Sequence, residues 1–239
     1  MVEVPSYLSA SIAIPTFLFA VSFWFLFHRA LYASKLKQDK LKFSLTVAFV
    51  LFAWFAFVLL ASFYGVFAFN ALVVPGIAIG FIVLFVTLKM VYSSEKIRAV
   101  VDLMPVHWLI AIQFYRIVGY SFFDLYERGL LPATFALSSG WGDIIVGVTA
   151  PIVALAWYLK LSFARKLAIA WSVVGIVDLM VAISMGILSY PDPVQVLGTT
   201  PSTALMALFP MAVIPLFAVP LALLLHFFTL RLVVKTSWR

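Results

Sequence analysis

Residues 108–128 read WLIAIQFYRIVGYSFFDLYER, a stretch of membrane-spanning length that carries an arginine, Arg116, near its middle. A transmembrane α-helix needs about 20 predominantly apolar residues, and this stretch supplies them. A guanidinium near the centre of a bilayer costs at least about 2.5 kcal/mol, so it needs a partner and marks a functional site by default. The stretch therefore predicts a transmembrane helix with a buried polar site.

The composition places the whole chain in the same environment. Of the 239 residues, 65% are hydrophobic and only 10% are charged, and the mean hydropathy is +1.16. About 25% of the residues of an average soluble domain are charged. We therefore expect an all-α integral membrane protein with one transmembrane domain over residues 1–239. The chain contains no cysteine, which excludes disulfides and thiolate metal sites.

Seven segments are long and apolar enough to span a bilayer, and they predict a bundle of seven transmembrane helices. Their approximate limits are residues 7–28, 42–64, 70–90, 105–126, 142–160, 166–188 and 204–231. In the last segment Pro210, Pro215 and Pro220 each remove a backbone hydrogen bond. We expect this helix to be bent or locally broken.

The basic residues fall in alternate connections and predict the orientation of the chain. Fourteen of the sixteen share one side: Arg29, Lys35, Lys37, Lys40, Lys42, Lys89, Lys96, Arg98, Lys160, Arg165, Lys166, Arg231, Lys235 and Arg239. The positive-inside rule makes that side cytoplasmic, with the N-terminus outside and the C-terminus cytoplasmic. We expect a multi-pass protein of the cell (plasma or inner) membrane. Its net charge of +7 then indicates topology and contact with lipid, and no nucleic acid is expected as a partner.

The fourth segment has a polar face. Gln113, Arg116, Tyr120, Asp124 and Glu127 recur at spacings of three or four and fall on one stripe of an α-helix. Such a stripe does not face lipid, because each polar group there would lack a partner. Since the acidic residues lie toward the outer surface, we expect the stripe to line either a helix contact or a cavity that opens outward.

Asp178 in the sixth segment is the expected partner of Arg116. Arg116 follows Pro105 by eleven residues and Asp178 follows Lys166 by twelve, which places both about 16–18 Å into the bilayer at 1.5 Å per residue. The pair has two interpretations, a clamp between two helices and a ligand or proton site. Both require the same contact, so both stay open.

The tetrapeptide Gly140-Trp141-Gly142-Asp143 resembles the G-x-G-D element that carries an active-site aspartate in presenilin-like and prepilin-type intramembrane proteases. The resemblance implies an aspartyl protease with a second aspartate, for which Asp124 and Asp178 are the candidates. We favour a structural role, in which Asp143 opens its helix and accepts hydrogen bonds from free backbone N–H groups. Asp143 and Glu127 are secondary site candidates.

Three histidines, His28, His107 and His226, are expected near the cytoplasmic interface. Imidazoles at one depth can ligate haem or a transition metal. No two of them have the spacing that puts two ligands on one helix face, and histidine is at home at a membrane interface. We therefore predict no metal site and no cofactor, with haem or quinone as the alternative.

A longer pattern, QFYRIVG…GLLPATFAL…GWGDIIVG…AP, is similar to one in uncharacterised prokaryotic polytopic membrane proteins. That resemblance implies about seven helices and no known activity.

Two classes of function stay open. One is a transporter-like or small-ligand or proton-handling protein, and the other is a haem-binding, quinone-binding or non-catalytic subunit of a larger, respiratory-type membrane complex or homo-oligomer. An enzyme is less expected than either.

Overall fold

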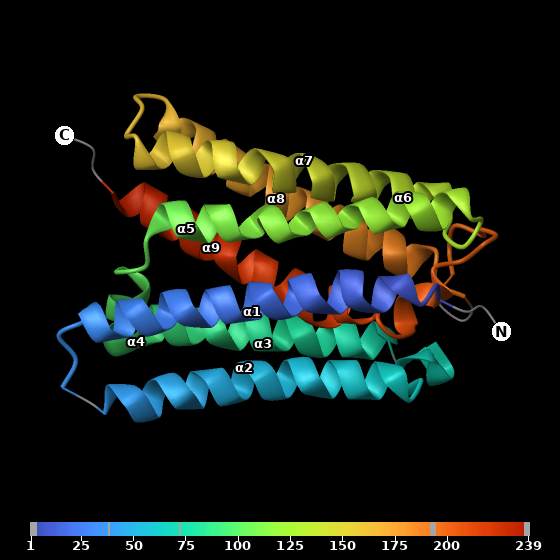
Figure 1. Cartoon of the computed structure of the whole chain (residues 1–239), viewed down its shortest axis with the longest axis horizontal. Coiled ribbons are helices and arrows are strands. Elements are labelled where there is room, and N and C mark those ends of the chain that lie inside the picture. The colour runs from blue at the N-terminus through green and yellow to red at the C-terminus, as the bar shows by residue number, and fades with distance from the viewer. Residues whose placement is uncertain (1–3, 38, 72, 192–194, 237–239) are drawn as a thin grey trace.

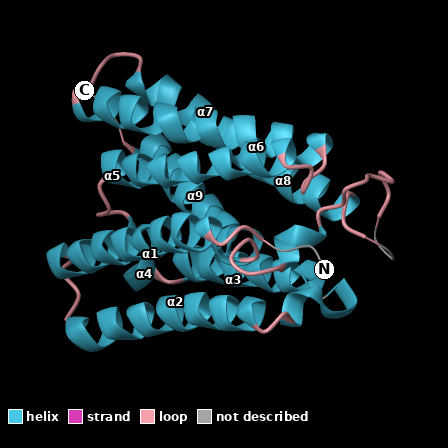
Figure 2. Cartoon of the chain, turned by 45° about the vertical axis from the view of Figure 1, so that its right-hand side comes forward, coloured by secondary structure: helices cyan, strands magenta, loops and turns pink. Residues whose placement is uncertain are grey.

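The structure is a computed structural model that describes residues 4–37, 39–71, 73–191 and 195–236. Within these ranges every regular element is a helix (Figure 2). The α-helices are α1 (Tyr7–Ala33), α2 (Lys40–Phe63), α3 (Val73–Ser93), α4 (Glu95–Val101), α5 (Val106–Ala111), α6 (Tyr120–Glu127), α7 (Ala133–Tyr158), α8 (Ala164–Leu188) and α9 (Val219–Lys235). Three 3₁₀ segments, η1 (Val66–Ala71), η2 (Ile112–Gly119) and η3 (Ala204–Ala207), and one π-helical segment, η4 (Ile214–Ala218), complete the described chain.

Six described helices are long and apolar enough to cross a membrane: α1, α2, α3, α7, α8 and the continuous η4–α9 unit. A seventh crossing is added if α4 and residues 106–127, which are bent by 77° relative to each other, form one span. Large apolar side chains such as Phe49, Ile82 and Phe85 are exposed on the outward helix faces, where lipid would cover them. The chain is therefore a multi-pass membrane protein with six to seven candidate spans.

Helix α9 runs through the middle of the bundle. On one side lie α7, α8 and the continuous helix formed by α5, η2 and α6, and on the other side lie α1, α2 and α3 (Figure 1). A helix that is hydrophobic on all sides is suited to such a central position. Nearly all side chains from Pro210 to Leu232 are buried accordingly.

The prolines of the last segment break its helix, as predicted. After η3 the chain is irregular around Pro210, becomes π-helical at Pro215, and is regular α-helix only from Val219 onward. A proline lacks the N–H that an α-helix needs in its interior, which explains why the regular helix is confined to the second half of the segment.

The fifth segment begins earlier than predicted. The expected limits were residues 142–160, but α7 starts at Ala133, directly after the N-cap residue Pro132. Gly140 and Gly142 both lie inside α7, so the G-x-G-D element is helical throughout. The prediction that Asp143 opens its helix is therefore wrong, because Asp143 lies ten residues after Ala133, well inside the bundle.

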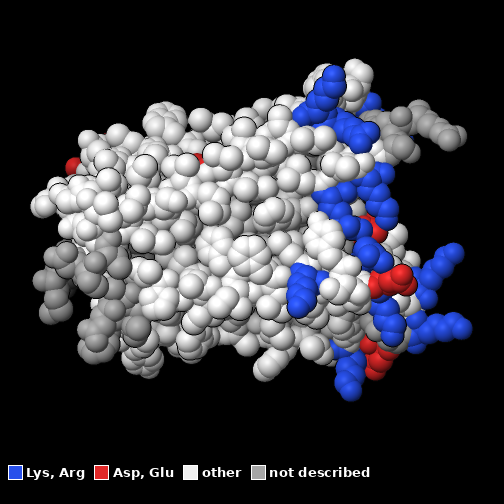
Figure 3. Space-filling model, turned by 180° about the vertical axis from the view of Figure 1, so that it is seen from behind, with Lys and Arg blue, Asp and Glu red and all other residues white. Residues whose placement is uncertain are grey.

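Lysine and arginine side chains gather at one end of the molecule, on the right in Figure 3. This basic end contains the α1–α2, α3–α4 and α7–α8 connections and the C-terminal end of α9; Arg239 lies outside the described residues. Asp102 ties α4 to α9 here, with Oδ1 3.0 Å from Arg231 Nε and Oδ2 2.6 Å from Lys235 Nζ. Partial burial raises the pKa of Asp102, but these two hydrogen-bonded cations outweigh it, so that the pKa lies below its usual value.

Candidate functional site

The 3₁₀ winding of η2 determines which side chains of the fourth segment enter the bundle. A 3₁₀ helix has three residues per turn, so residues three apart lie directly above one another. The buried residues of η2 follow this period: Gln113, Arg116 and Gly119. Tyr120 would continue the stripe only if the helix had 3.6 residues per turn. In the structure its side chain points away from the cluster side of η2 and the residue is 68% exposed. The change in winding thus separates Gln113 and Arg116 from the outer half of the predicted stripe.

The guanidinium of Arg116 is the centre of a buried polar cluster. Its Nε lies 2.7 Å from Asp143 Oδ1 on α7, and its Nη2 donates to Asp178 Oδ2 on α8. Its Nη1 lies 3.5 Å from Nε2 of His226 on α9. We call Arg116, Asp143, Asp178 and His226 the central cluster. It joins four helical segments, η2, α7, α8 and α9, at one point.

The predicted contact between Arg116 and Asp178 is confirmed, but two members of the cluster were not expected in it. Asp143 reaches Arg116 because α7 begins nine residues before the predicted start. His226 was expected near the cytoplasmic interface. It is fully buried beside Arg116, because α9 continues to Lys235, more than two turns beyond the histidine.

The charges of the central cluster do not balance if every group has its ordinary ionisation state. One guanidinium, with a fully buried side chain, faces two carboxylates whose side chains are only 14% and 10% exposed, for Asp143 and Asp178 respectively. A net charge in an apolar interior is costly, since little solvent is available to screen it. One proton bound by the two carboxylates together would make the cluster neutral.

Glycines on neighbouring helices make room for the two carboxylates. A Cβ atom placed on Gly142 of α7 would overlap Oδ1 of Asp178 on α8, and one placed on Gly119 of η2 would overlap the Cβ of Asp143. Any larger residue at either position would push a carboxylate away from Arg116. The G-x-G-D element therefore has a packing function here, in which Gly142 admits the aspartate of the next helix.

Glycines also make room for the ring of His226 and for the backbone of η2 next to Arg116. A Cβ atom on Gly175 of α8 would overlap the imidazole of His226. On α7, a Cβ atom on Gly147 would come within 3.0 Å of the backbone nitrogen of Ile117. Small residues let helix backbones approach closely in membrane proteins, and these contacts place polar groups of different helices within hydrogen-bonding distance.

Two further side chains tie η2 to the central helix. Gln113 donates from Nε2 to the carbonyl oxygen of Ala222 at 3.0 Å, and the hydroxyl of Tyr115 donates to that of Ala218 at 3.4 Å. The ring of Tyr115 also stacks on Phe19 of α1, with centroids 3.8 Å apart. Gln113 was a predicted site residue. It lies one 3₁₀ turn before Arg116, and its hydrogen bond to Ala222 holds η2 against α9.

The outer part of the predicted stripe forms a separate group. Asp124 accepts hydrogen bonds from the hydroxyl of Tyr7 on α1 and from Arg128 Nε at 3.0 Å, while Glu127 is exposed. Tyr120 and Asp124 line a groove of ≈ 930 Å³ between α1 and the α5–η2–α6 helix. The structure does not bring Tyr120, Asp124 or Glu127 to the guanidinium of Arg116.

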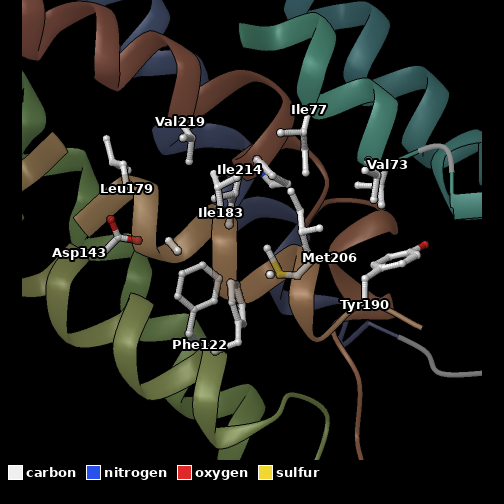
Figure 4. Close-up of a pocket in the computed structure, with 16 residues that line it drawn as sticks. Val73, Ile77, Phe122, Asp143, Leu179, Ile183, Tyr190, Met206, Ile214 and Val219 are labelled. Carbon is white, nitrogen blue, oxygen red and sulfur yellow. The ribbon is translucent and has the colours of Figure 1, made fainter. Parts of the chain in front are cut away.

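A narrow cavity leads from the central cluster toward the end of the molecule opposite the basic end. Asp143 lies on one side of it and Val73 and Tyr190 on the other (Figure 4). The space available to the centres of water-sized molecules is ≈ 40 Å³, which suffices for a few waters. Among its described lining residues, Asp143 alone carries a charged side chain. The cavity thus places an internal space of this size directly beside one carboxylate of the cluster.

The three histidines lie in different surroundings. His28 pairs with Ser44 through Nδ1 at 2.8 Å, and the ring of His107 lies beside that of Tyr158 at 5.3 Å. His226 contacts Arg116 and the ring of Trp171. In the described part of the chain, no group of three or more histidine and acidic side chains is arranged to hold a metal ion.

The fold and the site define a multi-pass α-helical membrane protein with a buried arginine–aspartate–aspartate–histidine cluster at its centre. The chain belongs to the family described as domain of unknown function DUF8737, whose model matches residues 73–234. The match contains all four residues of the central cluster and begins after α1 and α2. Neither the curated proteins nor the solved structures compared with the chain give a match.

Proposed function

We propose that the protein is transporter-like, that it moves protons across the membrane, and that the central cluster is its proton-binding site. The observation that carries the proposal is that two carboxylates share one guanidinium in an apolar bundle. Ionisable groups at this depth are costly and commonly mark proton relays and ion pathways. The proposal takes the basic end as cytoplasmic, in accordance with the positive-inside rule.

Each member of the cluster has a distinct role in this proposal. Arg116 remains charged and holds both carboxylates in place. Asp143 and Asp178 share the exchangeable proton, and Asp143 receives it through the cavity shown in Figure 4. When the proton arrives, the attraction of Arg116 for one carboxylate weakens, and the guanidinium is free to shift toward the other or toward His226. The proton thereby alters contacts between four helical segments.

The arrangement of the aspartates argues against a protease. In an aspartyl protease two carboxylates share a proton directly and activate one water between them. Here the guanidinium of Arg116 binds Asp143 with Nε and Asp178 with Nη2, so it occupies the position between the two acids. An attacking water would have to displace it, at the cost of leaving a buried cation unpaired.

One observation favours the second class of function, a quinone-binding subunit of a larger complex. An apolar cavity of ≈ 330 Å³ lies between α1, α2, α3 and α9, with Phe27, Phe43, Trp54 and Phe228 among its lining residues. Aromatic side chains pack well against flat rings and isoprenoid chains. Quinone recovered in stoichiometric amount from an organic extract of the purified protein would support this function, and its absence would leave proton movement as the better account.

Reconstitution into liposomes tests the proposed function. With a pH-sensitive dye inside and a potassium diffusion potential as the driving force, the wild-type protein is expected to move protons faster than empty liposomes do. Asp143→Asn and Asp178→Asn should each slow this flux at least about tenfold, because a positioned acid or base commonly contributes a factor of 10² or more to proton transfer. The matched control is Asp124→Asn, which removes an acid of the separate outer group. A wild-type flux equal to that of Asp143→Asn would contradict the proposal.

A further inference from the structure

On α8 and α9, three buried polar atoms at the central cluster and on its basic side have no partner in the described part of the protein. They are Nδ1 of His226, Oγ of Ser172 and Oγ1 of Thr229. The exposed fractions of these residues are 0%, 0% and 1%. A buried polar atom that makes no hydrogen bond is costly, and nearly all such atoms in proteins have a protein or water partner.

The helix geometry places these three atoms in one column. Gly175 on α8 faces the ring of His226 on α9 at close range. Ser172 precedes Gly175 by three residues, and Thr229 follows His226 by three residues, so each lies on the same face of its helix about 4.5 Å further along the axis. Both displacements point toward the basic end, because α8 begins there and α9 ends there (Figure 1).

The hydroxyls of Ser172 and Thr229, like that of Ser139 in the outer half of α7, make no hydrogen bond within the described part of the chain. In transmembrane helices a serine or threonine commonly donates to the carbonyl oxygen four residues back in its own helix. Thr16, Thr46, Thr87 and Ser184 do so, at 2.8–2.9 Å. Ser172 and Thr229 do not, although both are helical and buried. Their hydroxyls therefore remain available to another hydrogen-bonding partner at the α8–α9 contact.

We infer that ordered water links His226 Nδ1 to Ser172 and Thr229, and that this column forms the inner half of a proton path from the central cluster toward the basic end. The part of this inference that concerns proton movement rests on the proposed function, whereas the part that concerns water does not. Nε2 of His226 contacts Arg116, whereas the buried Nδ1 has no partner among the described residues. An imidazole can accept a proton at Nε2 and release the one on Nδ1. Because Arg116 keeps its protons, the proton that reaches Nε2 comes from Asp143 or Asp178 when the guanidinium shifts.

The charged and titratable groups around His226 come from three other elements. They are Arg116 and Tyr115 on η2, Asp143 on α7 and Asp178 on α8. The ring of Trp171, at 5.0 Å, covers another side of the imidazole, and its Nε1 donates to Thr149 Oγ1 at 3.0 Å. These charges lie on the cluster side of the histidine. Toward the basic end, the next charged side chain along α9 is Arg231, which pairs with Asp102.

The presence of water can be tested without any transport. A high-resolution cryo-EM map of the protein in lipid nanodiscs should contain density for at least one water within hydrogen-bonding distance of His226 Nδ1, Ser172 Oγ or Thr229 Oγ1. A map in which both hydroxyls instead donate to their own helix carbonyls, with no density beside the imidazole, would overturn the inference. This outcome would leave the proton site at Asp143 and Asp178 unaffected.

The role of the column in proton movement needs a second measurement in liposomes. The double variant Ser172→Ala, Thr229→Val removes both hydroxyls, and we expect it to slow the proton flux about tenfold or more. The matched control is Thr87→Val with Ser184→Ala, which removes two hydroxyls that bond only to their own helices. Equal fluxes in the two double variants would refute the path. A wild-type protein that moves no protons would refute the proposed function instead, and the cryo-EM map would still decide whether the water is present.

Discussion

Replacing Arg116 by glutamine is expected to lower the free energy of unfolding by about 3–5 kcal/mol, the cost of removing one partner from a buried ion pair. The substitution leaves Asp143 and Asp178 in an apolar interior without the cation that each contacts. Unfolding of the purified protein in mixed micelles, followed by circular dichroism as denaturing detergent is added, measures the change.

The compensating variant shows whether charge is the cause. Arg116→Gln combined with Asp143→Asn and Asp178→Asn removes all three charges, and we expect it to regain most of the lost stability. Removing only one of the aspartates should restore less, because the other carboxylate stays unpaired. Arg128→Gln is the control, since its side chain is 51% exposed and such ion pairs contribute about 0–1 kcal/mol. The same loss in Arg128→Gln and Arg116→Gln would mean that the central cluster does not stabilise the bundle.

Gly142→Ala is expected to be the most disruptive of the small substitutions in α7. The added methyl group would overlap Oδ1 of Asp178, so α8 must move or the carboxylate must leave Arg116. Overpacking of this kind costs about 1–3 kcal/mol, against an intrinsic gain of up to about 1 kcal/mol when alanine replaces glycine in a helix. The same detergent titration measures the effect.

The control for Gly142→Ala is Gly186→Ala in α8. Its added methyl group would meet only Phe135, at an ordinary contact distance of 3.5 Å. We therefore expect Gly186→Ala to be neutral or stabilising. If the two alanine variants have equal stability, the close approach of α7 and α8 at the central cluster is not what holds Asp178 in place.

The sequence predicted the helices well wherever hydrophobicity alone determined them. Segments 42–64, 70–90 and 166–188 agree with α2, α3 and α8 to within three residues at each end. The start of α7 was missed, because two serines and two glycines near Asp143 resemble a turn. The role of Gly142 in helix packing depends on Asp178 of α8, which lies 36 residues further along the chain, so no local feature of the sequence indicates it.

The site was predicted in part, for similar reasons. The depth of Arg116 and Asp178 follows from counting residues at a constant rise, and this count led to a correct pair. The stripe from Gln113 to Glu127 assumed 3.6 residues per turn throughout, and the 3₁₀ winding of η2 rotates its outer half away. A signal for that winding was present in the sequence only as the spacing of Gln113, Arg116 and Gly119, which is three residues throughout.

Asp143 and Asp178 are expected to hold one proton together at neutral pH, and infrared spectroscopy can detect that proton. A protonated carboxylic acid has a carbonyl stretch that a carboxylate lacks, and this band shifts in ²H₂O when the proton exchanges. We expect such a band in the wild-type protein at pH 7, unchanged in Asp124→Asn and absent from the double variant Asp143→Asn, Asp178→Asn. A wild-type spectrum at pH 7 without this band, or one whose band persists in the double variant, would contradict the account.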